Sequence, residues 1–126
     1  MKIFMQCLAI GAGGFVGALA RFFVYTFCAR LFNTTFPIGT FVINITGSLF
    51  LGWFLAVAGG RMIVSDTTRL AVATGFVGAY TTFSTFMYES NGLLEDGSGI
   101  KAIVNLVGSL LVGLIAVRIG IWIAGA

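Results

Sequence analysis

Hydrophobic residues occupy four long blocks of this chain, separated by short polar connections. The blocks cover roughly 4–29, 38–59, 69–90 and 101–124. A helix needs about 20 predominantly apolar residues to cross a bilayer, and each block meets or approaches that length. The pattern predicts an all-α membrane protein with a single domain, residues 1–126, and four transmembrane helices. An even number of spans places both termini on the same side of the membrane.

The third block is interrupted by small and polar residues at membrane depth. Residues 75–86 read Gly-Phe-Val-Gly-Ala-Tyr-Thr-Thr-Phe-Ser-Thr-Phe. Glycines and hydroxyl residues weaken a helix and release backbone carbonyls, which lipid cannot satisfy. Irregular backbone in a membrane must be buried in protein or line a watery path. We therefore expect a broken third helix that forms a binding or conduction site.

The composition excludes several classes of protein. Charged residues make up 9% of the chain, against about 25% in an ordinary soluble domain. The chain has no histidine and no phosphate-binding loop, so we expect neither an enzyme nor an ATP-driven pump, and no nucleic-acid partner. Its acids are Asp66, Glu89, Glu95 and Asp96, which we place in or near the connections. A proton-coupled exporter usually needs a carboxylate inside the membrane, which disfavours a small multidrug-type exporter.

The first block allows a second interpretation. Lys2 precedes an apolar run, and Ala18-Leu19-Ala20 resembles a signal-peptide cleavage site. The run continues past Arg21, however, which favours a first spanning helix. Cys7 and Cys28 would lie roughly 30 Å apart on that helix, beyond disulfide reach, so we expect buried free thiols.

Positive charge is nearly balanced between the two membrane faces. With four alternating spans, Lys2, Arg61 and Arg69 lie on one face, and Arg30 and Lys101 on the other. Orientation normally follows a clear Lys/Arg excess in the cytoplasmic loops. The balance favours insertion in both orientations, with antiparallel pairing of two copies. A single weakly biased orientation is the alternative.

The chain repeats itself at an offset of 61 residues. Gly14-Phe-Val-Gly-Ala18 recurs at 75–79, and the pattern Asn44-x-x-Gly-Ser-Leu-x-x-Gly52 recurs at 105–113. This indicates two tandem helical hairpins that point the same way, unless the match is a coincidence in a glycine-rich sequence. Small residues on one helix face allow close approach of membrane helices.

Two polar residues of the first half have alternative roles. Arg21 either extends to the interface or attracts an anion at the mouth of a path. Asn44 is costly in a membrane unless it is hydrogen-bonded. Its amide can donate to an anion, or it can tie two helices together.

Phe83 and Phe86 are three residues apart and share one side of a helix. They either pack against lipid and the core, or present their positive ring edges to a small anion in a narrow path. Nearby hydroxyl donors are Thr81, Thr82, Ser84 and Thr85, although such hydroxyls often bond back to the preceding helical turn.

The motif Gly-Phe-x-Gly-x-x-Thr-Thr-Phe-Ser-Thr-Phe at 75–86 resembles the signature of the small fluoride channels, the Fluc or CrcB family. Gly14-x-x-Gly-Ala-x-x-Arg21, Gly39-Thr-x-x-x-Asn44 and Asn105-x-x-Gly-Ser109 match the family in the same order. The resemblance covers essentially the whole chain.

This resemblance implies an antiparallel homodimer with two separate fluoride pores. It further implies a passive channel in the plasma (inner) membrane that exports fluoride. One structural sodium ion would lie between the two copies, held by the carbonyls of Gly78 and Thr81. The resemblance implies that the pores are lined by Phe83, Phe86, Asn44, Ser84, Thr85, Ser109 and Arg21.

Some positions depart from the family pattern. The chain has Gly78-Ala79 where relatives often have two glycines, and Gly113 where some carry a hydroxyl, so the fourth-helix part of the path is the least secure. Some relatives pair two different subunits. Two other functions remain open: a proton-coupled exporter and a non-transporting membrane scaffold.

Overall fold

Four helical spans and their short connections make up the part of the chain described by the computed structural model, residues 1–125. The first, second and fourth spans are single helices: α1 (Lys2–Leu31), α2 (Ile38–Gly60) and α6 (Gly99–Ile123). The third span, Asp66–Glu95, consists of several segments. All four are long and apolar enough to cross a membrane, which confirms the predicted class of an all-α membrane protein.

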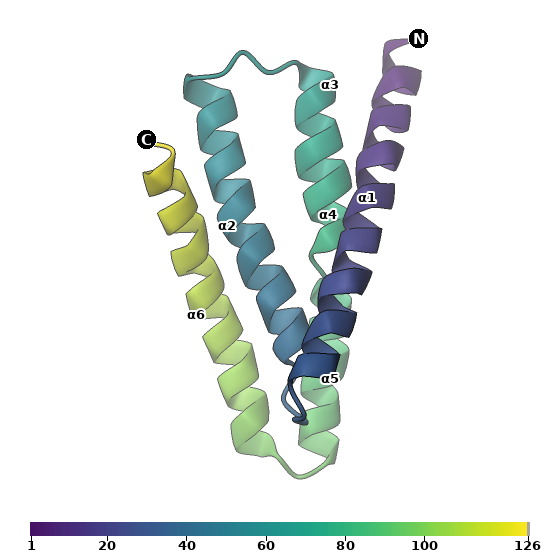
Figure 1. The fold of residues 1–126 in the computed structure, drawn as a ribbon. Coiled ribbons are helices and arrows are strands. Elements are labelled where there is room, and N and C mark those ends of the chain that lie inside the picture. Colours follow the sequence, from purple (N-terminus) through teal and green to yellow (C-terminus); the bar gives the residue numbers. More distant parts are fainter. Residues whose placement is uncertain (126) are drawn as a thin grey trace.

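The third span is broken near its middle, as the sequence predicts. It begins with α3 (Asp66–Arg69), continues as a π-helix, η1 (Leu70–Val77), and ends its first half with α4 (Gly78–Tyr80). After two extended residues it resumes as α5 (Phe83–Glu95). Figure 1 shows the interruption between α4 and α5.

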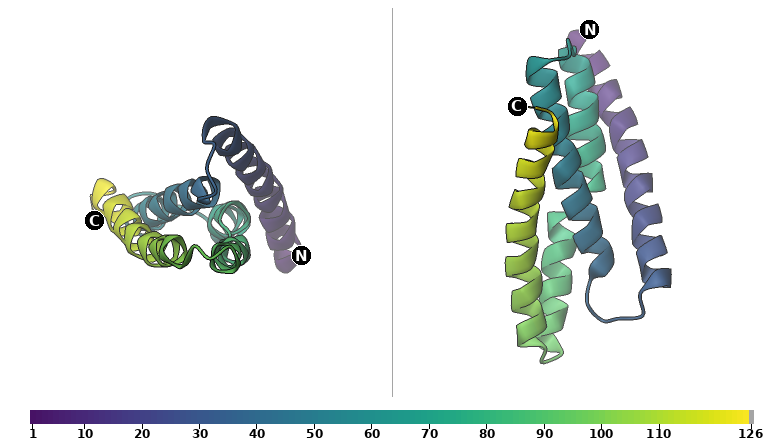
Figure 2. Two further views of the ribbon diagram at one scale, coloured as in Figure 1. Left: turned by 90° about the horizontal axis from the view of Figure 1, so that it is seen from below. Right: turned by 60° about the vertical axis from the view of Figure 1, so that its left-hand side comes forward.

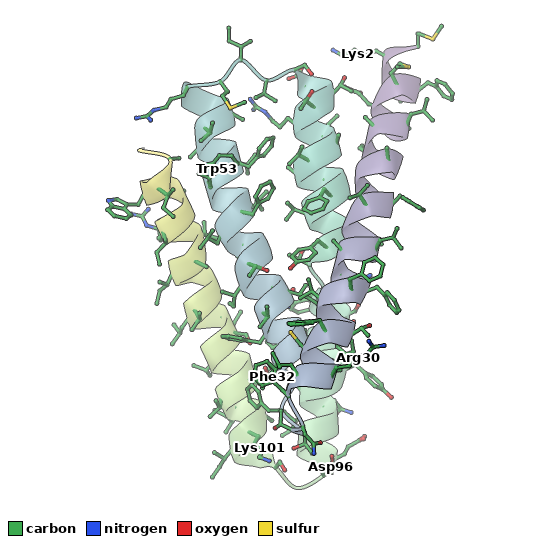
Figure 3. The ribbon with its side chains drawn as sticks, viewed as in Figure 1. Lys2, Arg30, Phe32, Trp53, Asp96 and Lys101 are labelled. Atoms are coloured by element: carbon green, nitrogen blue, oxygen red, sulfur yellow. The ribbon has the colours of Figure 1, made fainter. Side chains whose placement is uncertain are left out.

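Both termini lie at the same end of the molecule, beside the connection between α2 and α3 (Figure 1). Lys2 lies at this end, whereas Arg30, Asp96 and Lys101 lie at the opposite end (Figure 3). There, Lys101 Nζ donates to Thr35 Oγ1 at 3.2 Å and joins the start of α6 to the connection between α1 and α2. These four charged residues thus lie at the two ends, as expected for a chain that crosses a bilayer.

Each span makes its most extensive contacts with its counterpart in the sequence repeat: α1 with the first half of the third span, and α2 with α6. The end-on view in Figure 2 shows α1 and α6 at opposite edges of the bundle. Spans one and three run in one direction, and spans two and four in the other (Figure 1). This arrangement agrees with two hairpins that point the same way.

Glycines permit the closest helix contacts. A Cβ on Gly13 or Gly17 would collide with the backbone of Ala71 or Phe76 in η1. Between α2 and α6, a Cβ on Gly52 would meet the carbonyl of Val117. Backbone-to-backbone packing of this kind is how membrane helices associate without a hydrophobic driving force between them.

Few side chains are buried in the protomer. The largest fully buried ones are Ile43, Asn105 and Thr40, and most large apolar side chains of α1 and α6 point outward. Outward-facing apolar residues are expected where lipid is the solvent. Both cysteines are free, but only Cys28 is buried. The expectation of a buried Cys7 is wrong, because this residue lies on the exposed surface of α1.

Candidate functional site

The break in the third span is held open by Asn44 of α2. Thr81 and Thr82 have extended backbone, with ψ angles of 159° and 117°. The Asn44 amide donates to the Thr82 carbonyl at 3.0 Å, and its oxygen accepts from the Thr82 amide at 2.8 Å. In a continuous helix the Thr82 amide would donate to the carbonyl of Gly78 instead. Asn44 therefore substitutes for a missing helical hydrogen bond.

The two threonines at the break terminate the helices on either side. Thr81 Oγ1 donates to the Val77 carbonyl at 2.8 Å, back into the preceding turn. Thr82 Oγ1 accepts from the Thr85 amide at 3.3 Å and caps the start of α5. It also donates to Thr85 Oγ1 at 3.0 Å. These hydroxyls make the break a defined structure.

A groove of about 270 Å³ runs along one side of the break; we call it the break groove. It brings together four of the predicted path residues from α2, α5 and α6. Its lining comprises Asn44, Gly47, Ser48, Leu51, Val77, Thr81, Thr82, Phe83, Phe86, Ser109 and Leu110. Polar groups from three spans thus converge beside two aromatic rings.

Phe83 and Phe86 meet edge to face in this groove. Their ring centroids lie 6.3 Å apart with an interplanar angle of 72°. Phe86 is 6% exposed, whereas Phe83 is 71% exposed on the surface of the protomer. Because the edge of an aromatic ring is positive, such a pair can contact an anion without a fixed charge.

Asn44 retains a donor that the break does not use. A carboxamide carries two N–H hydrogens, and one of them points to Thr82. Asn44 also lines the break groove, and within residues 1–125 its amide donates only the one hydrogen bond. The two alternatives drawn from the sequence for Asn44 are therefore compatible, and the structure establishes the tie between helices.

A second hollow of about 310 Å³ lies between α1, α2 and α5 and shares Thr82 with the break groove. It contains two more of the predicted residues, Arg21 and Thr85, together with Thr40 and Thr82. Thr40 is 1% exposed, and its Oγ1 has no hydrogen-bond partner within residues 1–125. Arg21 lies ten residues before the end of α1, which is about 15 Å of helix. It is thus placed well inside the span and not at its end.

Three other predicted residues are placed differently. Ser84 is exposed on the protomer surface. Gly78 is also exposed, and a Cβ there would have no neighbour closer than 3.9 Å. Thr81 is half-buried at the break. Whether the Gly78 and Thr81 carbonyls bind sodium stays a prediction.

A chain of hydrogen bonds joins Ser109 of α6 to Phe86 of α5. Ser109 Oγ donates to Asn105 Oδ1 at 3.4 Å, and Asn105 Nδ2 donates to Ser90 Oγ at 3.0 Å. Ser90 Oγ donates in turn to the Phe86 carbonyl at 2.7 Å. Asn105 is 1% exposed. The position of α6 is thereby coupled to that of the inner aromatic residue.

Glu89, an acid that the sequence places in or near a connection, lies farther from the end of its helix than the predicted block 69–90 suggests. The third span continues to Glu95, so Glu89 lies within α5. It accepts from the Tyr25 hydroxyl at 3.3 Å, and its Oε2 is buried without a partner within residues 1–125. It lines a hollow of about 300 Å³ at the end of the molecule where Asp96 also lies. The polar stretch after Phe86 hid the continuation of the helix.

Sequence reasoning named Thr82 only as a hydroxyl donor and missed its structural role. It lines both hollows, caps α5 and is the partner of Asn44. The Thr-Thr pair in the motif was the available signal. The lining of the break groove contains hydroxyls, an amide and two aromatic rings, but no charged side chain. This chemistry suits weak, reversible contact with a small anion better than tight binding or proton transfer.

Comparisons with known proteins show the family to which the chain belongs. The sequence model of the family described as "CrcB-like protein, Camphor Resistance (CrcB)" matches residues 8–121. A protein of Chloroflexus aurantiacus named "Fluoride-specific ion channel FluC" is 43% identical over 122 residues, which cover 94% of this chain and 97% of the relative. "Fluoride-specific ion channel FluC 2" of Moorella thermoacetica is 43% identical over 120 residues, 95% of this chain and 96% of the relative. The chain is therefore a multi-pass membrane protein of the CrcB-like family.

Proposed function

We propose that this protein is a passive, fluoride-selective ion channel that exports fluoride from the cytoplasm across the plasma (inner) membrane. The observation that carries the proposal is the break groove, where an amide, hydroxyls and two aromatic rings converge beside an interrupted helix. The names of the relatives supply the identity of the ion.

A passive path is energetically sufficient. Hydrogen fluoride is a weak acid that crosses membranes uncharged and releases fluoride at neutral pH. The membrane potential contributes about 2.3 kcal/mol per charge for each 100 mV, and a tenfold gradient corresponds to about 1.4 kcal/mol. A potential of that size expels fluoride against such a gradient without nucleotide.

Each residue of the groove has a distinct role in this proposal. The edges of Phe83 and Phe86 contact the ion at the narrow point. The second N–H of Asn44 and the Ser109 hydroxyl replace part of its hydration shell. Arg21, in the second hollow, raises the local concentration of anions. Thr85 lines the hollow beside Arg21, and Ser84 continues the polar surface of α5.

Two copies would associate as an antiparallel homodimer. The near balance of Lys and Arg between the two ends supports dual insertion. In the protomer, Phe83 and Gly78 are both exposed beside the break, which is where a second copy would cover them. Some relatives of this kind pair two different subunits, which is the alternative to a homodimer.

A sodium ion fits the chemistry of this exposed surface. Residues 1–125 contain no group of three or more His, Cys, Asp or Glu side chains that could hold a metal. A cation here would thus need carbonyl oxygens, which are suitable hard ligands. Because Asn44 takes the Thr82 amide, the Gly78 carbonyl lacks its helical donor. Gly78 and Thr81 of both copies would hold the ion, which would add positive charge between the pores.

The decisive test uses liposomes that contain only this protein. We expect release of fluoride, measured with a fluoride electrode, with no comparable release of chloride under the same gradient. Release that requires a pH gradient and carries other substrates would indicate a proton-coupled exporter instead. Liposomes that stay electrically silent and retain both ions would indicate a scaffold subunit.

A further inference from the structure

We propose that Tyr80 is a positioning residue for the break, and that its hydroxyl acts through Thr46. This inference rests on the proposed channel function. Tyr80 is the last residue of α4 and is 9% exposed. Its hydroxyl lies 2.8 Å from Thr46 Oγ1 of α2. Neither residue belongs to the set predicted from the sequence.

Either hydroxyl can donate in this hydrogen bond, because each is both a donor and an acceptor. Thr46 Oγ1 also lies 2.7 Å from the Val42 carbonyl, one turn earlier in α2. When the single Thr46 hydrogen is on that carbonyl, Tyr80 donates to Thr46. The phenol group thus attaches the end of α4 to a hydroxyl that is itself fixed to its own helix.

The Tyr80 ring is held on its faces as well as at its tip. It stacks on Phe76 with a centroid distance of 5.9 Å and an interplanar angle of 4°. Across from it, a Cβ on Gly47 would lie 3.2 Å from Tyr80 Cδ1. Gly47 therefore leaves the space that the ring fills, and the ring has little freedom to change its orientation.

Together with the Asn44 contact, this hydrogen bond attaches α2 to the third span on both sides of the break. Asn44 binds Thr82 after the break, and Thr46 binds Tyr80 before it. Without the second attachment, the last turn of α4 could rotate about the Asn44 contact. The carbonyls of Gly78 and Thr81 would then lose their fixed direction, and the walls of the break groove would move relative to Phe83.

The test measures fluoride release by Tyr80→Phe, Thr46→Val, Thr46→Ser and the double variant Tyr80→Phe/Thr46→Val. Protein is reconstituted at low density, so that many vesicles hold one channel or none. The rate of release then reports flux through a folded channel, whereas the fluoride retained in vesicles reports how much protein is active. Tyr88→Phe is the matched control, because this tyrosine is 80% exposed on α5.

We expect Tyr80→Phe and Thr46→Val each to slow release roughly three- to tenfold with the retained fraction unchanged. Thr46→Ser keeps the hydroxyl and should stay within about twofold of the wild type, as should Tyr88→Phe. The double variant should be no slower than the slower single variant, because both remove the same hydrogen bond.

Wild-type release rates in Tyr80→Phe would overturn the inference while leaving the channel function intact. So would effects that multiply in the double variant, or a larger retained fraction with an unchanged rate, which is the signature of a folding defect alone. A wild-type protein that releases no fluoride would overturn the proposed function, and this inference with it.

Discussion

Asn44 and Asn105 occupy the same position of the repeated Asn-x-x-Gly-Ser motif, yet their amides do different work. Both hydrogen bonds that the Asn44 side chain makes within residues 1–125 go to the backbone of Thr82. Those of Asn105 go to side chains, Ser90 and Ser109. The difference lies in what faces each residue. Asn44 faces a break with unpaired backbone groups, whereas Asn105 faces α5, whose backbone is already hydrogen-bonded.

The glycines of the two motifs differ in the same way. A Cβ on Gly47 would collide with the Thr81 methyl group, whereas a Cβ on Gly108 would have no neighbour within 4 Å. The first copy of the motif therefore contacts the residues of the break, whereas the second only connects α6 to α5. The two copies thus differ in their partner spans and also in one residue of the motif, because Thr46, which contacts Tyr80, corresponds to Val107 in the second copy.

We expect the largest loss of fluoride efflux from substitutions of the aromatic pair on α5, the helix that follows the break. Phe83→Ile or Phe86→Ile should abolish fluoride efflux from liposomes and leave assembly intact, since isoleucine keeps an apolar side chain but lacks the positive ring edge. Gel filtration in detergent checks assembly. Phe15→Ile, at a residue 68% exposed on α1, is the control. Undiminished fluoride flux in both Phe83→Ile and Phe86→Ile would show that these rings serve only in packing.

The next effect separates the two asparagines. Asn44→Ala leaves the Thr82 amide and carbonyl without partners, at a cost of about 1–3 kcal/mol, so we expect flux to fall roughly ten- to a hundredfold. Asn105→Ala leaves only the hydroxyls of Ser90 and Ser109, which can bond back to their own helices, and should cost less. Hydrogen exchange at Thr82 should accelerate in Asn44→Ala alone.

Asn44→Asp sharpens this prediction. The carboxylate still accepts from the Thr82 amide but cannot donate to the Thr82 carbonyl, and it places a negative charge in the path of an anion. Flux should be at least as low as in Asn44→Ala. Wild-type rates would remove Asn44 from the pore and leave it with the structural role alone.

Much of this comparison could be predicted from the sequence, because it depends on local chemistry. The lengths of the apolar blocks predicted four spans, and the glycines and threonines of 75–86 predicted the break. The π-helical winding of Leu70–Val77 could not be predicted, since its residues are compatible with an α-helix. It arises where Gly13 and Gly17 bring α1 against the backbone of η1.

The hydrogen-bond partners of the polar residues could not be predicted from the sequence either. An amide in a membrane helix must be hydrogen-bonded, but the choice between an anion and a backbone group depends on a distance across two helices. The same holds for the Tyr80 hydroxyl, whose partner is 34 residues away in the sequence. Family resemblance proposed which residues line the groove, but it did not predict that Arg21 and Thr85 lie in a separate hollow.

A smaller effect separates the two glycines. Gly47→Ala should destabilise the folded protein by about 1–3 kcal/mol, because the new methyl group pushes against Thr81, which is fixed at the break. Gly108→Ala should be neutral or slightly stabilising, since alanine favours a helix over glycine by about 0.5–1 kcal/mol. Thermal unfolding in detergent measures both. Equal melting temperatures of the two variants would contradict the view that only the first motif packs against the break.

The smallest effect concerns the serines of the two motifs, where the copies are alike. Ser48 and Ser109 are separated by the repeat offset, and both line the break groove from different helices. The hydrogen bond from Ser109 to Asn105 is long, at 3.4 Å, so its loss should hardly change how α6 packs against α5. Ser48→Ala and Ser109→Ala should therefore each slow efflux only roughly twofold, through the loss of one hydroxyl facing the ion. The two effects should multiply in the double variant, because the hydroxyls act from separate helices. A much larger loss of efflux in Ser48→Ala than in Ser109→Ala would contradict this view. It would show that the two motifs also differ in their serines, and that only the hydroxyl on α2 contributes to efflux.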